Sequence, residues 1–121
     1  MSKAIDPLEE ARSAAQALHG KLTTAKDHAA IRANARVVAA EAAMLALSIK
    51  ALLESQKTDA KHHLHDAAVA LEAASKDAHE AAGANDATLK EKRSAMRSRI
   101  RAAVALLSLA LAAKRATLVK A

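Results

Sequence analysis

The sequence predicts an all-α protein, and three features of its composition lead to this prediction. Alanine and leucine, both strong helix formers, account for 36 and 15 of the 121 residues. The chain has no Phe, Trp or Tyr, although strands favour aromatic and β-branched residues. With only two glycines and one proline, it also lacks the residues that turn a chain between strands. We therefore expect helices only, forming a single bundle domain over residues 1–121.

The first helix is expected over residues 6–20. Asp6 can cap it, because Pro7 follows at the position where helices favour proline, and two acids come next in the first turn. Gly20 is expected to end this helix. The result is a short helix with a clear start.

The second and third helices are expected over residues 24–55 and 59–82. Thr24 opens a segment that resembles a capping box, with Asp27 in place of the usual glutamate. Neither glycine nor proline breaks the chain within these ranges, so the boundary must lie in the polar stretch ESQKTDAK. The sequence leaves open whether one long helix runs through this stretch.

The fourth helix is expected over residues 86–120, with Gly83 ending the third helix and Asp86 capping the fourth. Apolar residues recur along the last three helices at the spacing of a buried helix face. Short connections then predict an up-down-up-down four-helix bundle with a short first helix and long second and fourth helices. The expected core positions are Ile31, Ala35, Val38, Ala42, Leu45, Ile49, Leu52, Leu64, Ala67, Leu71, Ala74, Ala78, Leu89, Met96, Ile100, Ala103, Val104, Leu107, Leu111 and Leu118.

Opposite its core face, the second helix carries another apolar stripe, and the fourth helix carries a shorter one. A helix that is apolar all round is either buried on every side or has a partner. The first helix, at roughly 22 Å, is expected to cover only the N-terminal half of the second, at roughly 48 Å. We therefore expect a homodimer or higher oligomer, unless a bent fourth helix covers the stripe. The expected self-association surface consists of Val37, Met44, Leu47, Ala51, Leu106 and Leu109.

The net charge is +6, and much of the excess lies in KEKRSAMRSRIR, residues 90–101. In the expected packing this segment lies near basic residues of the second helix, so one end of the bundle can engage phosphates or a nucleic-acid backbone. The alternative is a solvated face that acids on neighbouring helices neutralise. Without aromatic rings there is no platform for stacking single-stranded bases. The candidate anion-binding residues are Arg32, Arg36, Lys92, Arg93, Arg97, Arg99 and Arg101.

Three histidines lie within the stretch KHHLHD of the third predicted helix. Asp59, His62, His63 and Asp66 could form a shallow site for a divalent ion such as zinc or nickel. No pair has the His-x-x-x-His spacing that chelates well from one helix, so we expect adventitious metal binding rather than a resident cofactor. The simplest interpretation is that these histidines lie on the solvated face of the helix.

The segment HHLHDAAVAL also resembles the phosphoacceptor segment of histidine phosphotransfer domains, which are four-helix bundles. His62, Leu64 and Leu71 match the family pattern, as do two small residues between the leucines. The lysine and glycine of the family are replaced by His65 and Asp66, which adds a side chain and a negative charge. The resemblance implies that His62 would accept a phosphoryl group and exchange it with response regulators.

No pattern typical of an enzyme stands out, such as a glycine-rich phosphate loop or a nucleophile with a nearby base. The N-terminal residues lack the apolar core of a signal peptide, and the longest uncharged run, residues 102–113, is about half a membrane span. We therefore expect a cytoplasmic, non-enzymatic scaffold or small binding protein that acts by self-association. The lack of aromatic residues is also compatible with a designed or simplified sequence.

Overall fold

The computed structural model describes residues 6–55 and 58–120, except the side chains of 58–59 and 117–120. Nearly all of these residues are helical, and no strand occurs among them, so the predicted all-α class is confirmed. α2 and α3 are separate helices, which settles the alternative that the sequence left open. The four helices are α1 (Pro7–Thr24), α2 (His28–Leu53), α3 (Thr58–Ala82) and α4 (Asp86–Lys120).

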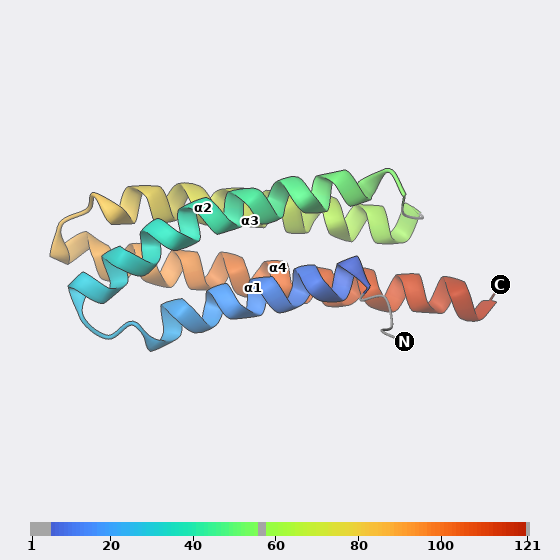
Figure 1. Ribbon diagram of the computed structural model, residues 1–121, viewed down its shortest axis with the longest axis horizontal. Helices are drawn as coiled ribbons and strands as arrows, with labels where there is room; N and C mark the ends of the chain where they lie inside the picture. The colour runs from blue at the N-terminus through green and yellow to red at the C-terminus, as the bar shows by residue number, and fades with distance from the viewer. Residues whose placement is uncertain (1–5, 56–57, 121) are drawn as a thin grey trace, which may run out of the picture.

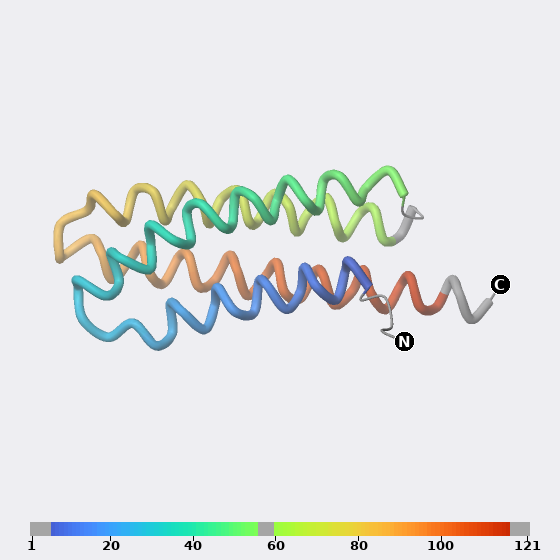
Figure 2. Tube along the Cα trace, viewed as in Figure 1, coloured from blue at the N-terminus to red at the C-terminus, as the bar shows by residue number. Residues whose placement is uncertain are grey.

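The four helices lie side by side along the long axis of the molecule (Figure 1). The chain reverses direction at each connection, so successive helices are antiparallel (Figure 2). α1 and α3 each pack against both α2 and α4, whereas α2 and α4 touch only a little across the bundle diagonal. This arrangement is compatible with the predicted up-down-up-down bundle. α4 extends beyond the start of α1 at one end (Figure 1).

α1 begins as predicted and ends one turn later than expected. The Asp6 carboxylate accepts a hydrogen bond from the backbone N–H of Leu8 at 2.9 Å, and Pro7 takes the first helical position. Gly20, the predicted end, lies inside the helix and does not adopt a positive φ. A glycine ends a helix when it turns the chain into the left-handed region. Because Gly20 does not do so, the helix continues to Thr24.

α2 and α4 begin at caps that neighbour the predicted ones. Asp27 rather than Thr24 caps α2, and its carboxylate accepts a backbone N–H of the first turn at 2.7 Å. Asn85 rather than Asp86 caps α4 in the same way, at 2.9 Å. Asp, Asn and Thr are all good N-caps, so composition alone does not choose between them. Asp86 instead forms an ion pair with Arg32.

The core is one cluster built mainly of alanine and leucine. The predicted core positions are buried, except Leu45, Leu52 and Val104, which are half-buried against the cluster, and Leu118, whose side chain is outside the described residues. Alanine lets helices approach closely, but each buried methyl group removes little area from water. Larger side chains therefore supply most of the hydrophobic stabilisation. Those that are fully buried are Leu8, Leu18, Leu22, Ile31, Ile49, Leu64, Leu71, Leu89, Met96, Ile100, Leu107 and Leu111.

α1 covers a different part of α2 from the one expected. Pro7 at the start of α1 lines a pocket together with Leu52 near the end of α2. Lys21 near the end of α1 pairs with Glu41 in the middle of α2, with 3.4 Å between nitrogen and oxygen. α1 therefore lies along the C-terminal half of α2, and the expectation that it covers the N-terminal half is wrong. The extended connection between the helices sets this offset, because it separates the end of α1 from the first turns of α2.

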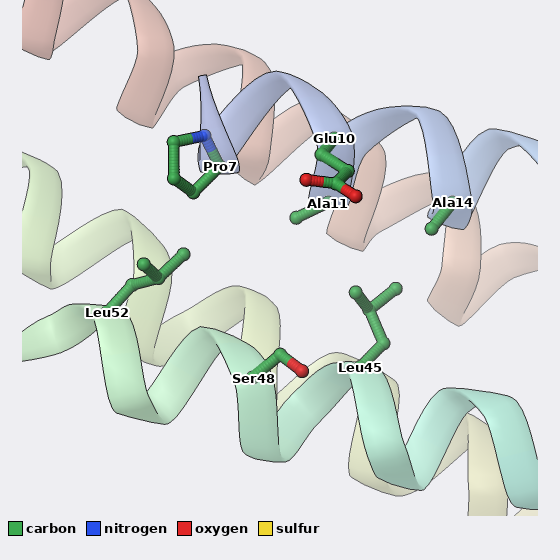
Figure 3. Close-up of a pocket in the computed structure, with 7 residues that line it drawn as sticks. All are labelled: Pro7, Glu10, Ala11, Ala14, Leu45, Ser48 and Leu52. Atoms are coloured by element: carbon green, nitrogen blue, oxygen red, sulfur yellow. The ribbon is translucent and has the colours of Figure 1, made fainter. Parts of the chain in front are cut away.

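The pocket between α1 and α2 has a volume of about 330 Å³ (Figure 3). Leu45 and Leu52 point from α2 toward α1, where the short side chains of Ala11 and Ala14 leave space between the helices. The contact between α1 and α2 is accordingly sparser than the contact between α1 and α4. α1 therefore depends mainly on α4 for its place in the bundle.

Basic side chains of α4 bind both ends of α1. Arg93 donates from Nε to the carbonyl oxygen of Leu22 at 2.9 Å and from Nη2 to that of Thr23 at 3.0 Å. These carbonyls belong to the last turn of α1, where helices lack internal donors and favour a positive charge. At the other end, Lys114 donates to both carboxylate oxygens of Asp6 at 3.2 Å. α1 is thus held at its two ends by α4.

We predict that Arg93→Met lowers the free energy of unfolding by about 1–2 kcal/mol, because it removes two charge-assisted hydrogen bonds to the end of α1. Urea unfolding followed by circular dichroism measures this change. Lys90→Met is the matched control, since Lys90 is exposed on the same helix, and it should change the free energy by less than about 0.5 kcal/mol. Equal losses in the two variants would contradict the role given to Arg93.

Candidate functional site

The outward face of α2 carries an exposed apolar stripe. Val37 is 37% exposed, Met44 68% and Leu47 65%. These side chains alternate with alanines at spacings of four and three residues, so they follow one side of the helix along most of its length. We call this surface the α2 stripe. Its residues, all exposed, are Ala33, Val37, Ala40, Met44, Leu47 and Ala51.

The α2 stripe lies opposite the face that α2 contributes to the core. Ile31, Val38 and Ile49 are fully buried on that core face, and the helical repeat places the stripe on the far side of the helix. α1 and α3 pack against the flanks of α2 and leave its outer side uncovered. α2 is therefore apolar on two opposite faces, of which the bundle covers one.

Charged residues border the α2 stripe without entering it. On the border next to α3 lie Arg36 and Lys50, and Lys50 forms an ion pair with Glu72 of α3. On the border next to α1 lies Glu41, paired with Lys21. Of the residues that α2 itself contributes, those on one border are thus basic and the one on the other border is acidic.

Two predicted members of the self-association surface do not join the α2 stripe. Leu106 is half-buried against the core cluster, and Leu109 is 51% exposed on α4. α2 and α4 occupy opposite corners of the bundle, so their outer faces point away from each other. The sequence pattern predicts the height of a residue along the bundle but not its direction around the bundle axis, so it does not separate the outer face of α2 from that of α4.

Four of the predicted anion-binding residues bind groups within the chain. Arg93 binds the last carbonyls of α1, as described above, and the others form ion pairs with acids on neighbouring helices. Each of these pairs leaves one cation fewer for an external anion. Arg36, Arg97 and Arg101 remain, with no ion pair among the described residues. The ion-pair partners are Asp86 for Arg32, Glu80 for Lys92 and Asp77 for Arg99.

His19 belongs to a site between α1 and α4 that the sequence did not reveal. It lies on α1 and lines a pocket together with Gln16 of the same helix and Arg101 and Val104 of α4. Burial lowers the pKa of His19, and the positive charges of Arg97 and Arg101 lower it further. The residues of this site are far apart in the sequence, so only the pairing of α1 with α4 brings them together.

Two histidines of α3 pair with one aspartate. A carboxylate oxygen of Asp66 lies 3.6 Å from Nε2 of His62, and the other lies 3.5 Å from Nδ1 of His65. No three or more His, Cys, Asp or Glu residues are placed to hold a metal ion in the part of the chain that was described. The side chain of Asp59 lies outside that part. Metal binding by Asp59, His62, His63 and Asp66 therefore stays a prediction.

His62 is exposed on α3, as a phosphoacceptor would have to be. The Asp66 carboxylate beside its Nε2 places a negative charge where the negatively charged phosphoryl group would approach. This geometry favours the interpretation of these histidines as part of a solvated helix face.

Comparisons with known protein families, with characterised proteins and with solved structures gave no match to this chain. Within residues 6–55 and 58–120, no helix has the length and apolar character to cross a membrane.

We predict that the stability of the protein falls as the pH drops through the ordinary pKa of histidine, 6.5, toward the lower pKa of folded His19. Over this range the unfolded chain binds a proton at residue 19 more readily than the folded chain, so protonation favours unfolding. Asp86 does not contribute in this window, because its pKa is lowered from 3.8, chiefly by the hydrogen bond from Arg32.

Unfolding free energies at about pH 7.5 and about pH 5.5 test this prediction. The difference between the two pH values should be smaller in His19→Gln than in the original protein. His79→Gln serves as the control for loss of one imidazole, since His79 is exposed on α3. An unchanged difference in His19→Gln would count against the assignment.

Proposed function

We propose that this chain acts by self-association, as a non-enzymatic helical scaffold whose copies pair through the α2 stripe. The observation that supports the proposal is the exposure of Val37, Met44 and Leu47 on a helix face that carries no charge. Large exposed apolar side chains arranged in one line on a protein surface usually mark an interaction site. A second copy of the same face is the partner proposed here, because that face is self-complementary about a two-fold axis.

The spacing of the α2 stripe suits a coiled-coil contact between two α2 helices. Intervals of four and three residues place Val37, Met44 and Ala51 at one set of contact positions and Ala33, Ala40 and Leu47 at the other. Large and small residues therefore alternate along the seam. The alanine layers allow the two helices to approach closely, and the larger side chains fill the layers between them.

The expected affinity of this pairing is modest. Complete burial of a Val, Leu or Met side chain contributes about 1.5–3 kcal/mol. Six such side chains in a dimer, each partly buried already, would contribute on the order of 5–10 kcal/mol. This is comparable with the cost of about 4–15 kcal/mol for losing independent motion on association. We therefore expect a reversible dimer with micromolar affinity or weaker.

The charges that border the α2 stripe favour a parallel arrangement of the two helices. In a parallel pair, the basic border of one copy faces the acidic border of the other, which places Arg36 of each copy near Glu41 of its partner. In an antiparallel pair, like borders face each other, so that Arg36 approaches Lys50. Opposite charges attract and like charges repel, so the parallel dimer is the proposed one.

The second candidate function is binding of anions or of a nucleic-acid backbone by the basic residues. It is less favoured as the main function because internal pairs engage most of the predicted residues. Arg97 and Arg101 lie close to the pocket that contains His19. These two residues therefore belong to a smaller basic site than the one expected from the sequence.

We predict that Met44→Glu weakens self-association by at least about a hundredfold, because two carboxylates would enter an apolar seam. Sedimentation velocity over a series of protein concentrations measures the change. The helical content should stay the same, since Met44 is exposed in the single chain. Val69→Glu is the matched control: Val69 is 51% exposed but lies on α3, and its substitution should leave the dimer intact. A monomer at several hundred micromolar before any substitution would contradict the proposal.

A charge exchange tests the orientation. We predict that Arg36→Glu alone and Glu41→Arg alone each weaken the dimer about tenfold, since each creates two like-charge contacts worth about 0.5–1 kcal/mol apiece. The double variant Arg36→Glu/Glu41→Arg should recover the original affinity, because opposite charges face each other again. Additive losses in the double variant would speak against the parallel arrangement.

A further inference from the structure

The groove between α1 and α4 contains a small pocket that lies apart from the α2 stripe. Its volume is about 130 Å³, and Gln16, His19, Arg101 and Val104 line it. Val104 is half-buried, and the other three side chains carry polar groups, although most of the exposed lining is apolar. Arg97 precedes Arg101 by one turn of α4 and lies close enough to His19 for its charge to act there.

Two polar atoms, one on a side chain that lines the pocket and one on a side chain near it, are buried without a hydrogen-bond partner among the described residues. They are Nε2 of His19 and Nε of Arg97. Burying a polar group without a partner costs free energy, so a ligand that supplied a partner to these atoms would bind favourably. Arg93 differs from Arg97, because its guanidinium donates hydrogen bonds to the last carbonyls of α1. For Nε of Arg97, one turn further along α4, the described part of the chain supplies no acceptor.

The charged groups that act on His19 are both positive. The two charged groups that shift the pKa of His19 are the guanidinium groups of Arg97 and Arg101 on α4, and both lower it. On α1 itself, the hydroxyl oxygen of Thr23 lies 3.5 Å from Nδ1 of His19, and Gln16 is the other polar neighbour. The site therefore combines positive charge with several N–H donors.

We propose that this pocket binds a doubly charged tetrahedral oxyanion, of the kind that phosphate, a phosphate monoester or sulfate presents. Arginine donors are arranged in a planar fork that matches the oxygens of such a group and hold it better than a lysine would. Arg97 and Arg101 would contribute charge and hydrogen bonds from α4, and His19 and Gln16 would donate from α1. The bound anion would add a link between α1 and α4, beside the one that Arg93 makes.

Sulfate is the probe for the first test, because it stays doubly charged over the pH range in which histidine titrates. Ring-proton NMR signals of the six histidines are followed against pH in about 10 mM sodium sulfate and in about 30 mM sodium chloride, which have equal ionic strength. His19→Gln identifies the signal of His19. A nearby anion should raise the pKa of His19 by about one unit in sulfate relative to chloride. The other five histidines should shift by much less.

Two variants distinguish a specific anion site from general screening of charges by salt. Arg101→Gln should remove at least about half of the sulfate-dependent shift, since it deletes one of two guanidinium groups. Lys90→Gln changes the net charge equally but lies outside the pocket, and it should keep the full shift. Adding phosphoserine or inorganic phosphate in increasing concentration at constant pH, with the His19 signal as the readout, shows whether a phosphate carried on a larger molecule binds as well as the free ion. Binding of either form supports the site.

The proposal is overturned if His19 has the same pKa in both salts, as it would in a pocket that holds only water. It is also overturned if Arg101→Gln and Lys90→Gln reduce the shift equally. The measurements are made on Met44→Glu as well as on the unchanged chain. A sulfate effect that persists in Met44→Glu separates anion binding from self-association, so that either proposal can fail without the other.

Discussion

α2 carries apolar side chains on two opposite faces, and three neighbouring helices can cover only one of them. The core face of α2 is filled by contacts with the rest of the bundle. The outer face, with Met44 and Leu47 about two-thirds exposed, remains in contact with solvent. Burial of apolar area is the main favourable term in folding and association alike. α2 therefore supplies side chains to the core and also those proposed to pair two copies. Burial of apolar area stabilises both contacts.

The basic residues of α4 are distributed in a way that the net charge of +6 does not suggest. Arg93 and Lys114 hold the two ends of α1, and Arg99 pairs with Asp77 of α3. In an alanine-rich core, which buries little area per residue, such long side chains add contacts between helices that methyl groups cannot reach. Arg97 and Arg101 lie on the side of α4 that faces α1, where their charges meet another base rather than an acid.

Several elements of this fold follow directly from local sequence signals, and others do not. The cap at Asp6 and the core positions of α3 were predictable, because capping chemistry and helical periodicity act within a few residues. Gly20 is predicted to end α1 but lies inside it, since a glycine can continue a helix or end it, and its neighbours decide which. The exposure of Met44 followed from its position on the helix. The direction that Leu106 takes, and the meeting of His19 with Arg101, depend on how helices are arranged around the bundle axis, which periodicity does not report.

The parallel dimer can be tested most directly by cross-linking, because the chain has no cysteine of its own. Ala33 stands at one end of the α2 stripe, so Ala33→Cys places a single thiol there. In a parallel dimer the two thiols lie opposite each other across the seam, within reach of a disulfide. In an antiparallel dimer they lie roughly 27 Å apart along the helices. Mild oxidation of Ala33→Cys should therefore give a covalent dimer in high yield, and a product that stays monomeric at concentrations where the unchanged chain is dimeric would contradict the account.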